Sequence, residues 1–180
     1  MSIAADHPLV QALLHGVRAE RTPVWFMGQS RLRLTEQLAL LDGRGILESS
    51  VDPELAADLT LQPVRRLGVD GAVFFSSIVV PLALAGVDVE IVPGRGPVVA
   101  ELIRSPTDVL RLPMLDPEVL APIREGVALA VAELGSTPLI AIAGAPYTLA
   151  SYLIEGGPSR DHLRTRTMMY AEPHAWAGLL

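Results

Sequence analysis

Short apolar runs recur along the chain, each followed by a loop and then by a helical pattern. They occupy residues 24–27 (VWFM), 69–75 (VDGAVFF) and 139–143 (LIAIA). Such runs are largely apolar on both faces instead of alternating, which is typical of buried parallel strands. Because helical segments separate them, the pattern predicts βα units in series and therefore a parallel α/β sheet.

The helical segments show apolar positions at a spacing of three and four residues. Residues 8–17 predict an amphipathic helix capped by Asp6. Asp52 and Pro53 are typical of a helix start, and Pro63 is expected to kink or interrupt that helix. Further helices are predicted at residues 36–41, 107–110, 117–134 and 160–170, with another opening at Pro173. Residues 87–92 alternate acidic and apolar positions, which predicts an edge strand or hairpin arm.

The stretch at residues 137–159 has the clearest organisation. Its apolar run ends at Gly144, and residues 148–154 predict the first turns of a helix stopped by Gly156 and Gly157. The loop between them therefore lies at the carboxyl end of a buried strand, where α/β enzymes place their chemistry. Tyr152 is expected one turn into this helix, close to that loop.

Composition narrows the function classes. The chain has 180 residues, 50% of them hydrophobic, and a net charge of −6, so it offers no basic surface for nucleic acid. It has no cysteine, which excludes disulfides and is compatible with a reducing cytoplasm. The N-terminus lacks a signal-peptide pattern, and the uncharged stretch at residues 138–154 is better explained as strand plus loop than as a membrane span.

Common cofactor and metal motifs are absent from the sequence. Neither a dinucleotide-binding G-x-G-x-x-G after a strand nor a P-loop occurs, and no G-x-S-x-G elbow is present. The histidines show no metal-ligand spacing: His7, His15, His162 and His174. We therefore expect neither a metal nor a cofactor.

Four ordered segments carry a family resemblance. They are residues 23–32 (PVWFMGQSRL), 60–66 (TLQPVRR), 75–78 (FSSI) and 144–157 (GAPYTLASYLIEGG). Together they resemble the uroporphyrinogen decarboxylase family, whose patterns are P-V-W-x-M-R-Q-A-G-R, T/S-L-Q-P-x-R-R, F-S-D-I and G-A-P-x-T-L-x-x-Y-x-x-E-G-G. The similarity extends from about residue 22 to the end of the sequence.

The resemblance implies a fold and a reaction. The family fold is a (β/α)8 barrel, which typically needs about 250 residues. We therefore expect residues 1–180 to form one partial domain, the N-terminal half of a TIM-type barrel. The family reaction is the cofactor-free conversion of uroporphyrinogen III to coproporphyrinogen III with loss of four carboxyl groups, in a cytoplasmic homodimer.

The resemblance also implies which residues contact the substrate, and several are substituted here. The family aspartate, which binds the pyrrole N–H groups, falls on Ser77, and arginines that grip substrate carboxylates fall on Gly28, Leu32 and Leu41. Ser30 is a further substituted position of the first motif. Arg31 is displaced by one residue from the lost arginine and could replace it only in part. Gln29 and Tyr152 keep the family identity.

These substitutions predict a family member that is catalytically impaired on its own. One alternative is half of a split enzyme, completed by a separate chain that supplies the rest of the barrel. Another is a non-catalytic half-barrel that dimerises and binds a tetrapyrrole or a protein through its unpaired strand edges. A related zinc methyltransferase is disfavoured because no cysteine ligand exists.

Structural roles compete with the functional ones at several positions. Taken without the family resemblance, Tyr152 reads as a packing residue of an amphipathic helix. Arg65 and Arg66 are expected to face solvent or to pair with Asp58 and Asp70. The remaining acidic residues of interest read as helix caps: Asp52, Asp116 and Asp161.

Overall fold

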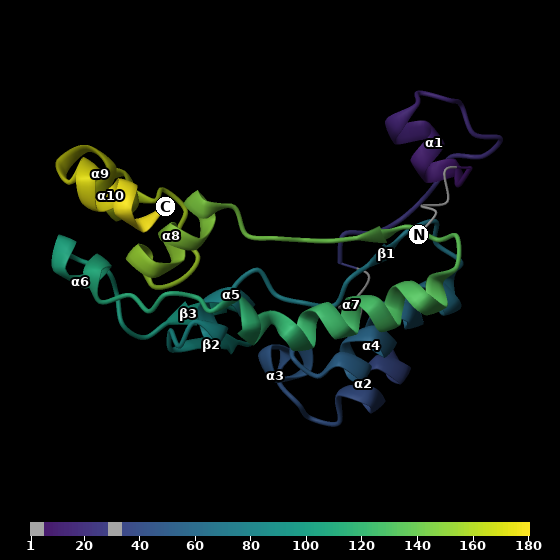
Figure 1. The fold of residues 1–180 in the computed structure, drawn as a ribbon, viewed down its shortest axis with the longest axis horizontal. Coiled ribbons are helices and arrows are strands. Elements are labelled where there is room, and N and C mark those ends of the chain that lie inside the picture. The colour runs from purple at the N-terminus through teal and green to yellow at the C-terminus, as the bar shows by residue number, and fades with distance from the viewer. Residues whose placement is uncertain (1–5, 29–33) are drawn as a thin grey trace. The chain divides into compact units, whose positions relative to one another are not determined.

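The computed structural model describes residues 6–28 and 34–180, and its chain divides into two compact units (Figure 1). The first unit comprises the described residues of Met1–Ser77 and Ala121–Ile142. The second comprises Ile78–Leu120 and Ala143–Leu180. The two units are described separately below.

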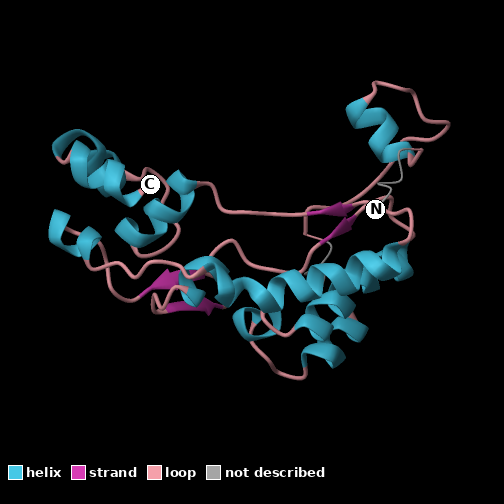
Figure 2. Ribbon diagram, in the orientation of Figure 1, coloured by secondary structure: helices cyan, strands magenta, loops and turns pink. Residues whose placement is uncertain are grey.

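The first unit contains a parallel strand pair and the helices that pack with it (Figure 2). Its elements are α1 (Pro8–Leu14), α2 (Thr35–Leu41), α3 (Ile46–Ser50), α4 (Pro53–Leu67), β1 (Ala72–Val73), α7 (Ala121–Leu134) and β4 (Leu139–Ile140). Ala72 lies opposite Leu139 and Val73 opposite Ile140 in parallel register. This pairing confirms the parallel arrangement that the apolar runs predict.

Helices α4 and α7 lie along each other in the first unit (Figure 1). Gly126 of α7 makes this approach possible, because a β-carbon there would lie 3.1 Å from the carbonyl oxygen of Pro53. Two hydrophobic clusters lie among the described residues of this unit. Leu55, Leu59 and Phe75 form one with Leu40, Leu41 and Ile46, and Leu61, Ala72 and Leu134 form the other with Val64 and Leu139.

Helix α4 begins as predicted but is not interrupted. The Asp52 carboxylate accepts a hydrogen bond from the Leu55 N–H at 3.1 Å, and Pro53 is the first helical residue. Pro63 lies inside the helix, which continues to Leu67, so Pro63 does not interrupt it, and the kink stays a prediction. A proline leaves the carbonyl four residues earlier without its helical donor. That carbonyl belongs to Leu59, and the buried Gln37 side chain of α2 donates to it at 3.5 Å.

Other elements of the first unit differ from the sequence prediction. His7, not Asp6, caps α1, and its Nδ1 accepts from the Leu9 N–H at 3.3 Å. The run at residues 24–27 forms no strand, although the Val24 carbonyl accepts from the Asp70 N–H at 2.8 Å. Beyond β4, residues 141–143 are exposed instead of buried. Helix α3 was not predicted, because its five residues are too few for a helical period.

The second unit combines a hairpin with short helices. Its elements are α5 (Val80–Leu84), β2 (Val89–Val92), β3 (Gly96–Val99), α6 (Pro106–Leu110), the 3₁₀ helix η2 (Pro117–Leu120), α8 (Pro146–Glu155), α9 (Leu163–Ala171) and α10 (Pro173–Leu179). Strands β2 and β3 are antiparallel, with Val89 opposite Val99, which confirms the predicted hairpin arm. Helix α5 was not predicted.

The hairpin and the segment after it bind the carboxyl end of α8. The Val99 N–H donates to the Gly156 carbonyl at 3.2 Å, and the Ile103 N–H donates to the Leu153 carbonyl at 3.0 Å. The Arg104 guanidinium donates to the Ile154 carbonyl at 2.6 Å. These donors satisfy carbonyl groups that a helix end leaves unpaired. Tyr152 is therefore carried by a helix whose last turn is fixed.

Candidate functional site

Ser77 lies just beyond β1, at the end of a strand that is firmly attached to α4. Its side chain is buried, with 7% of the residue exposed. Two residues earlier, the Phe75 N–H donates a hydrogen bond of 2.8 Å to the Thr60 hydroxyl, which itself donates to the Ala56 carbonyl at 2.7 Å. Thr60 is completely buried. Ser77, which the family resemblance aligns with the family aspartate, thus follows a strand end that is held by a buried hydroxyl of the TLQPVRR segment.

Replacing Thr60 by valine is expected to destabilise the protein by about 1–3 kcal/mol, because it leaves the buried Phe75 N–H without a partner. Valine keeps the shape and the methyl group. Thr60→Ser keeps the hydroxyl and loses only a methyl group, worth about 1 kcal/mol. Urea denaturation followed by circular dichroism measures both variants. A valine variant at least as stable as the serine variant would show that the hydroxyl does not hold the strand end.

An ion pair attaches the segment before residues 23–32 to Asp70, which lies two residues before β1. The Arg21 guanidinium donates to both carboxylate oxygens of Asp70, at 2.7 and 2.5 Å. The Val24 N–H donates to the same carboxylate at 2.8 Å. The hydrogen bonds from Arg21 lower the pKa of Asp70 below its ordinary value; burial opposes this and the Val24 N–H adds to it. Asp70 therefore fixes the backbone that leads toward Gly28.

Because the pKa of Asp70 is lowered in the folded protein, its stabilising effect is complete above the ordinary aspartate pKa of about 3.9 and is lost as the pH falls through the lower folded value. Asp70→Asn is expected to reduce the free energy of unfolding at pH 7 and to flatten its acid dependence. The matched control is Asp58→Asn, at an exposed acid of α4 that has no ion-pair partner among the described residues. Equal acid dependence of the Asp70 variant and the unmodified chain would contradict the assignment.

The positions of the family arginines are only partly within the described structure. Gly28 is exposed, and Leu41 packs against the cluster of Leu55, Leu59 and Phe75. Leu41 is therefore a partly buried residue that packs against the core. The predictions for Gln29, Ser30, Arg31 and Leu32 concern residues outside the described ranges, and they remain predictions.

Tyr152 lies in α8, half-buried between the buried residues Ser151 and Leu153. The helix follows Gly144 closely, because a β-carbon at Gly144 would lie 2.6 Å from the Leu149 side chain and 3.2 Å from the Ile78 carbonyl oxygen. This contact explains why the GAP turn needs glycine at its first position. Ser77 belongs to the first unit and Tyr152 to the second, so their roles in one site remain a prediction.

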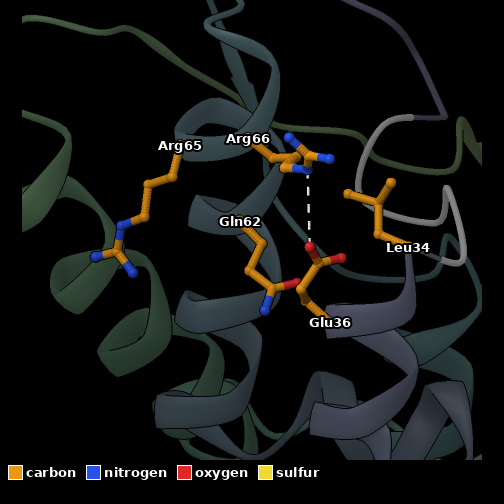
Figure 3. Close-up of a pocket in the computed structure, with 5 residues that line it drawn as sticks. All are labelled: Leu34, Glu36, Gln62, Arg65 and Arg66. Carbon is orange, nitrogen blue, oxygen red and sulfur yellow. Dashed lines mark ion pairs between the residues drawn. The ribbon is translucent and has the colours of Figure 1, made fainter.

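A hollow on the first unit brings together residues that the sequence analysis did not place in a site. It is lined by Leu34, Glu36, Gln62, Arg65 and Arg66 (Figure 3). Arg65 and Arg66 are exposed, which confirms the expectation that they face solvent. Their ion-pair partners are Glu133 and Glu36, not Asp58 and Asp70. The spacing of Gln62, Arg65 and Arg66 is three and four residues, which puts them on one helix face. This spacing is visible in the sequence and could have indicated that the three side chains share one surface.

The described residues, 6–28 and 34–180, include neither a cluster of metal ligands nor a membrane-spanning helix. In those ranges no group of three or more histidine, aspartate or glutamate side chains could hold a metal ion. Among the helices of the same ranges, none is long and apolar enough to cross a membrane.

Comparison with known proteins identifies relatives over almost the whole chain. The family model described as uroporphyrinogen decarboxylase (URO-D) matches residues 6–180. Proteins named uroporphyrinogen decarboxylase are 56% identical in Arthrobacter sp. (strain FB24) and 55% identical in Nocardia farcinica (strain IFM 10152). Each match covers 97% of this chain, but 50% and 49% of the respective relative. The chain therefore spans about half the length of the relatives it matches.

The fold has a counterpart among solved structures. A methyltransferase from Methanosarcina mazei superposes with a TM-score of 0.68 at 18% identity, over 94% of this chain and 50% of the other. At this identity the likeness concerns the fold alone. It confirms the predicted fold class, half of a (β/α)8 barrel. Since the family model matches nearly every residue, this chain belongs to the uroporphyrinogen decarboxylase family.

Proposed function

We propose that this chain is a uroporphyrinogen decarboxylase-like half-barrel that does not by itself convert uroporphyrinogen III to coproporphyrinogen III. The observation that carries the proposal is Ser77, a buried neutral residue at the position where the family pattern has an aspartate. In the family reaction a pyrrole ring is protonated, and the carboxylate offsets the positive charge that develops. A serine hydroxyl can donate and accept hydrogen bonds, but it carries no charge.

The size of this effect follows from electrostatic catalysis. Removing one preorganised group that stabilises transition-state charge lowers the rate by about 10²- to 10³-fold. The arginine positions at Gly28, Leu32 and Leu41 add to the loss, because none of these side chains can bind a substrate carboxylate as a guanidinium does. Effects of groups that act together are not additive. Gln29 and Tyr152 would then contact a substrate without completing the reaction.

The exposed residues 141–143 favour association with another chain as part of this function. They continue β4 with the sequence AIA, and an apolar strand that lies open tends to acquire a neighbour. The proposed partner is either a complementary barrel half or a second copy in a homodimer, in the cytoplasm and without a cofactor. Sedimentation of the chain alone, and mixed with the separately produced C-terminal half of the Arthrobacter relative, tests this. A monodisperse monomer in both samples would contradict it.

The decisive experiment is anaerobic incubation of the purified chain with uroporphyrinogen III, with products separated by chromatography. We expect no products with seven to four carboxyl groups above a no-protein control. The Arthrobacter relative serves as positive control, and circular dichroism establishes that the chain is folded. Product formation by the chain alone would refute the proposal, and it would mean that Gln29, Tyr152 and Arg31 suffice.

A further inference from the structure

Three consecutive residues at the end of α8 contact different parts of the second unit. They are Glu155, Gly156 and Gly157, the E-G-G of the family pattern. A β-carbon at Gly156 would lie 2.7 Å from the Leu102 side chain, and one at Gly157 would lie 3.4 Å from the Pro97 carbonyl oxygen. The two glycines therefore allow the hairpin and the segment after it to approach α8, whereas Glu155 contacts α9.

Glu155 binds the first turn of α9, which lies beside α8 (Figure 1). Its Oε1 atom accepts a hydrogen bond from the Thr165 N–H at 2.8 Å and another from the Thr165 hydroxyl at 2.9 Å. Thr165 is completely buried, so neither donor can turn to water instead. Loss of the Glu155 carboxylate would deprive two buried donors of their acceptor, which is unfavourable.

This carboxylate replaces the cap that a helix normally receives from its own chain end. The N–H of the third helical residue has no acceptor within the helix, and the side chain of the N-cap residue usually binds it. In α9 the N-cap residue is His162, which has a left-handed backbone conformation, φ 50°, and forms no side-chain capping hydrogen bond. Glu155 accepts from that N–H instead, and the helix dipole favours a carboxylate there. A cap supplied by α8 joins the two helices, whereas a cap from His162 would not.

A second contact joins the start of α8 to α9 and α10. The ring centroid of Tyr147 lies 5.9 Å from that of His162 and 5.8 Å from that of Trp176, in tilted and edge-to-face arrangements. Aromatic rings attract each other in such arrangements. Helix α8 is therefore connected to the α9 region near both of its ends.

We propose that Glu155 is a positioning residue, which fixes the direction of Tyr152 by holding α8 on α9. The two residues are three positions apart, so they are neighbours on the surface of α8. A shift of α8 relative to α9 therefore moves the phenol of Tyr152. The inference rests on the proposed function, in which Tyr152 contacts a tetrapyrrole.

The three tyrosines of the chain make the position of Tyr152 measurable by NMR. Labelling of the tyrosine rings with ¹³C gives signals from Tyr147, Tyr152 and Tyr170, which single replacements by phenylalanine assign. Glu155→Ala is expected to shift the Tyr152 signals and to raise hydrogen exchange at the Thr165 N–H about tenfold. Glu155→Gln is expected to preserve both, because its amide oxygen can accept the same two hydrogen bonds. Tyr170, which is 86% exposed, serves as internal reference.

Anaerobic calorimetric titration with uroporphyrinogen III tests whether Glu155 acts through Tyr152. Tyr152→Phe removes one hydrogen bond to the substrate, so we expect affinity to fall about two- to tenfold. Glu155→Ala is expected to lower affinity by a similar factor, and Glu155→Gln to retain it. The double variant Glu155→Ala, Tyr152→Phe should bind no more weakly than Tyr152→Phe alone. Glu101→Ala, at an exposed carboxylate of the same unit, is the matched control and should change nothing.

Thr165→Val provides a milder test in case Glu155→Ala does not fold. It removes only the hydroxyl donor and keeps the side-chain shape, so a smaller shift of the Tyr152 signals in the same direction is expected. Unchanged Tyr152 signals in a folded Glu155→Ala or Thr165→Val variant would overturn the proposal. So would additive losses of affinity in the double variant. Absence of uroporphyrinogen binding by the unmodified chain would instead contradict the substrate contact in the proposed function, and the NMR comparison alone would then decide on Glu155.

Discussion

A chimera that carries residues 6–180 of this chain in place of the matching half of the Arthrobacter relative is expected to lose decarboxylation of uroporphyrinogen III. The two sequences are 56% identical over the matched half, which favours folding of the chimera. The chimera contains the other half of the barrel from the relative. A loss of activity in it is therefore attributed to the substituted residues of this chain. We expect a fall in kcat/KM well beyond the roughly 10²- to 10³-fold of one lost charge. Chromatography of the porphyrin products measures it.

Restoring the family residues in the chimera tests the cause of that loss. Ser77→Asp alone is expected to recover little, because the carboxylate-binding arginines are still missing. Combined with Gly28→Arg and Leu32→Arg, it is expected to recover activity by orders of magnitude. Ser76→Asp is the matched control, since it puts the same carboxylate one position earlier in the same loop. An unrestored chimera with the relative's full activity would contradict the assigned role of Ser77.

Leu41→Arg is a special case within the same series. Leu41 packs against Leu55, Leu59 and Phe75, so an arginine there meets an apolar cluster. Burying an unpaired charge is unfavourable, and the side chain would have to extend out of the cluster. We therefore expect this restoration to lower stability even where it assists binding. Because Leu41 packs against this cluster, we expect the leucine to be harder to replace by the family arginine than Ser77 is by the family aspartate.

Local sequence signals predicted the elements that depend on local physics. Asp52 and Pro53 mark the start of α4 because capping and the proline backbone act within one turn. The β2–β3 hairpin and the α8 stop at Gly156 follow in the same way, and Gly156 has the left-handed conformation, φ 82°, that favours glycine. The family motifs also gave the position of Ser77 at the end of a buried strand.

Long-range pairings could not be predicted from the sequence. Arg21 and Asp70 are 49 positions apart, and nothing local indicates that they form a pair. Nor does any local pattern indicate the role of Gln37. Its side-chain amide, on α2, donates to the Leu59 carbonyl that Pro63 cannot bind. The run at residues 24–27 was predicted as a strand from its apolar pattern. Strand formation also requires a neighbouring strand with matching backbone hydrogen bonds. Here the Val24 carbonyl accepts from the Asp70 N–H, but the Val24 N–H donates to the Asp70 side chain instead of to a strand.

The candidate site likewise has some features that the sequence predicts and others that depend on long-range contacts. Motif matching assigned Ser77, Tyr152, Gln29 and the substituted arginine positions without any knowledge of contacts. It could not show that Leu41 would be absorbed into a hydrophobic cluster, or that Arg65 would turn toward Glu133. Both outcomes depend on which side chains the fold brings to one place. The hollow at Gln62 and Arg66 was missed for this reason.

Phe75→Ala is expected to have the largest effect on stability of the core substitutions, about 3–5 kcal/mol. Phe75 is 2% exposed and fills the cluster with Leu55 and Leu59, so its removal leaves a cavity and loses apolar burial. A folded protein is stable by only about 5–15 kcal/mol, so this loss removes much of the total. The free energy of unfolding from urea denaturation, followed by circular dichroism, measures it.

The same substitution links stability to the site. Phe75 precedes Ser77 by two residues, and its N–H is bound by Thr60. Losing the aromatic anchor therefore loosens the strand end that carries Ser77, and hydrogen exchange is expected to rise at residues 72–75. Leu67→Ala is the matched control, because Leu67 ends α4 with 45% of its surface exposed and should change stability by less than about 1 kcal/mol. Equal losses in the two variants would mean that Phe75 does not anchor the core. A large loss for Phe75 alone would establish that side-chain packing inside the unit holds the strand end at Ser77.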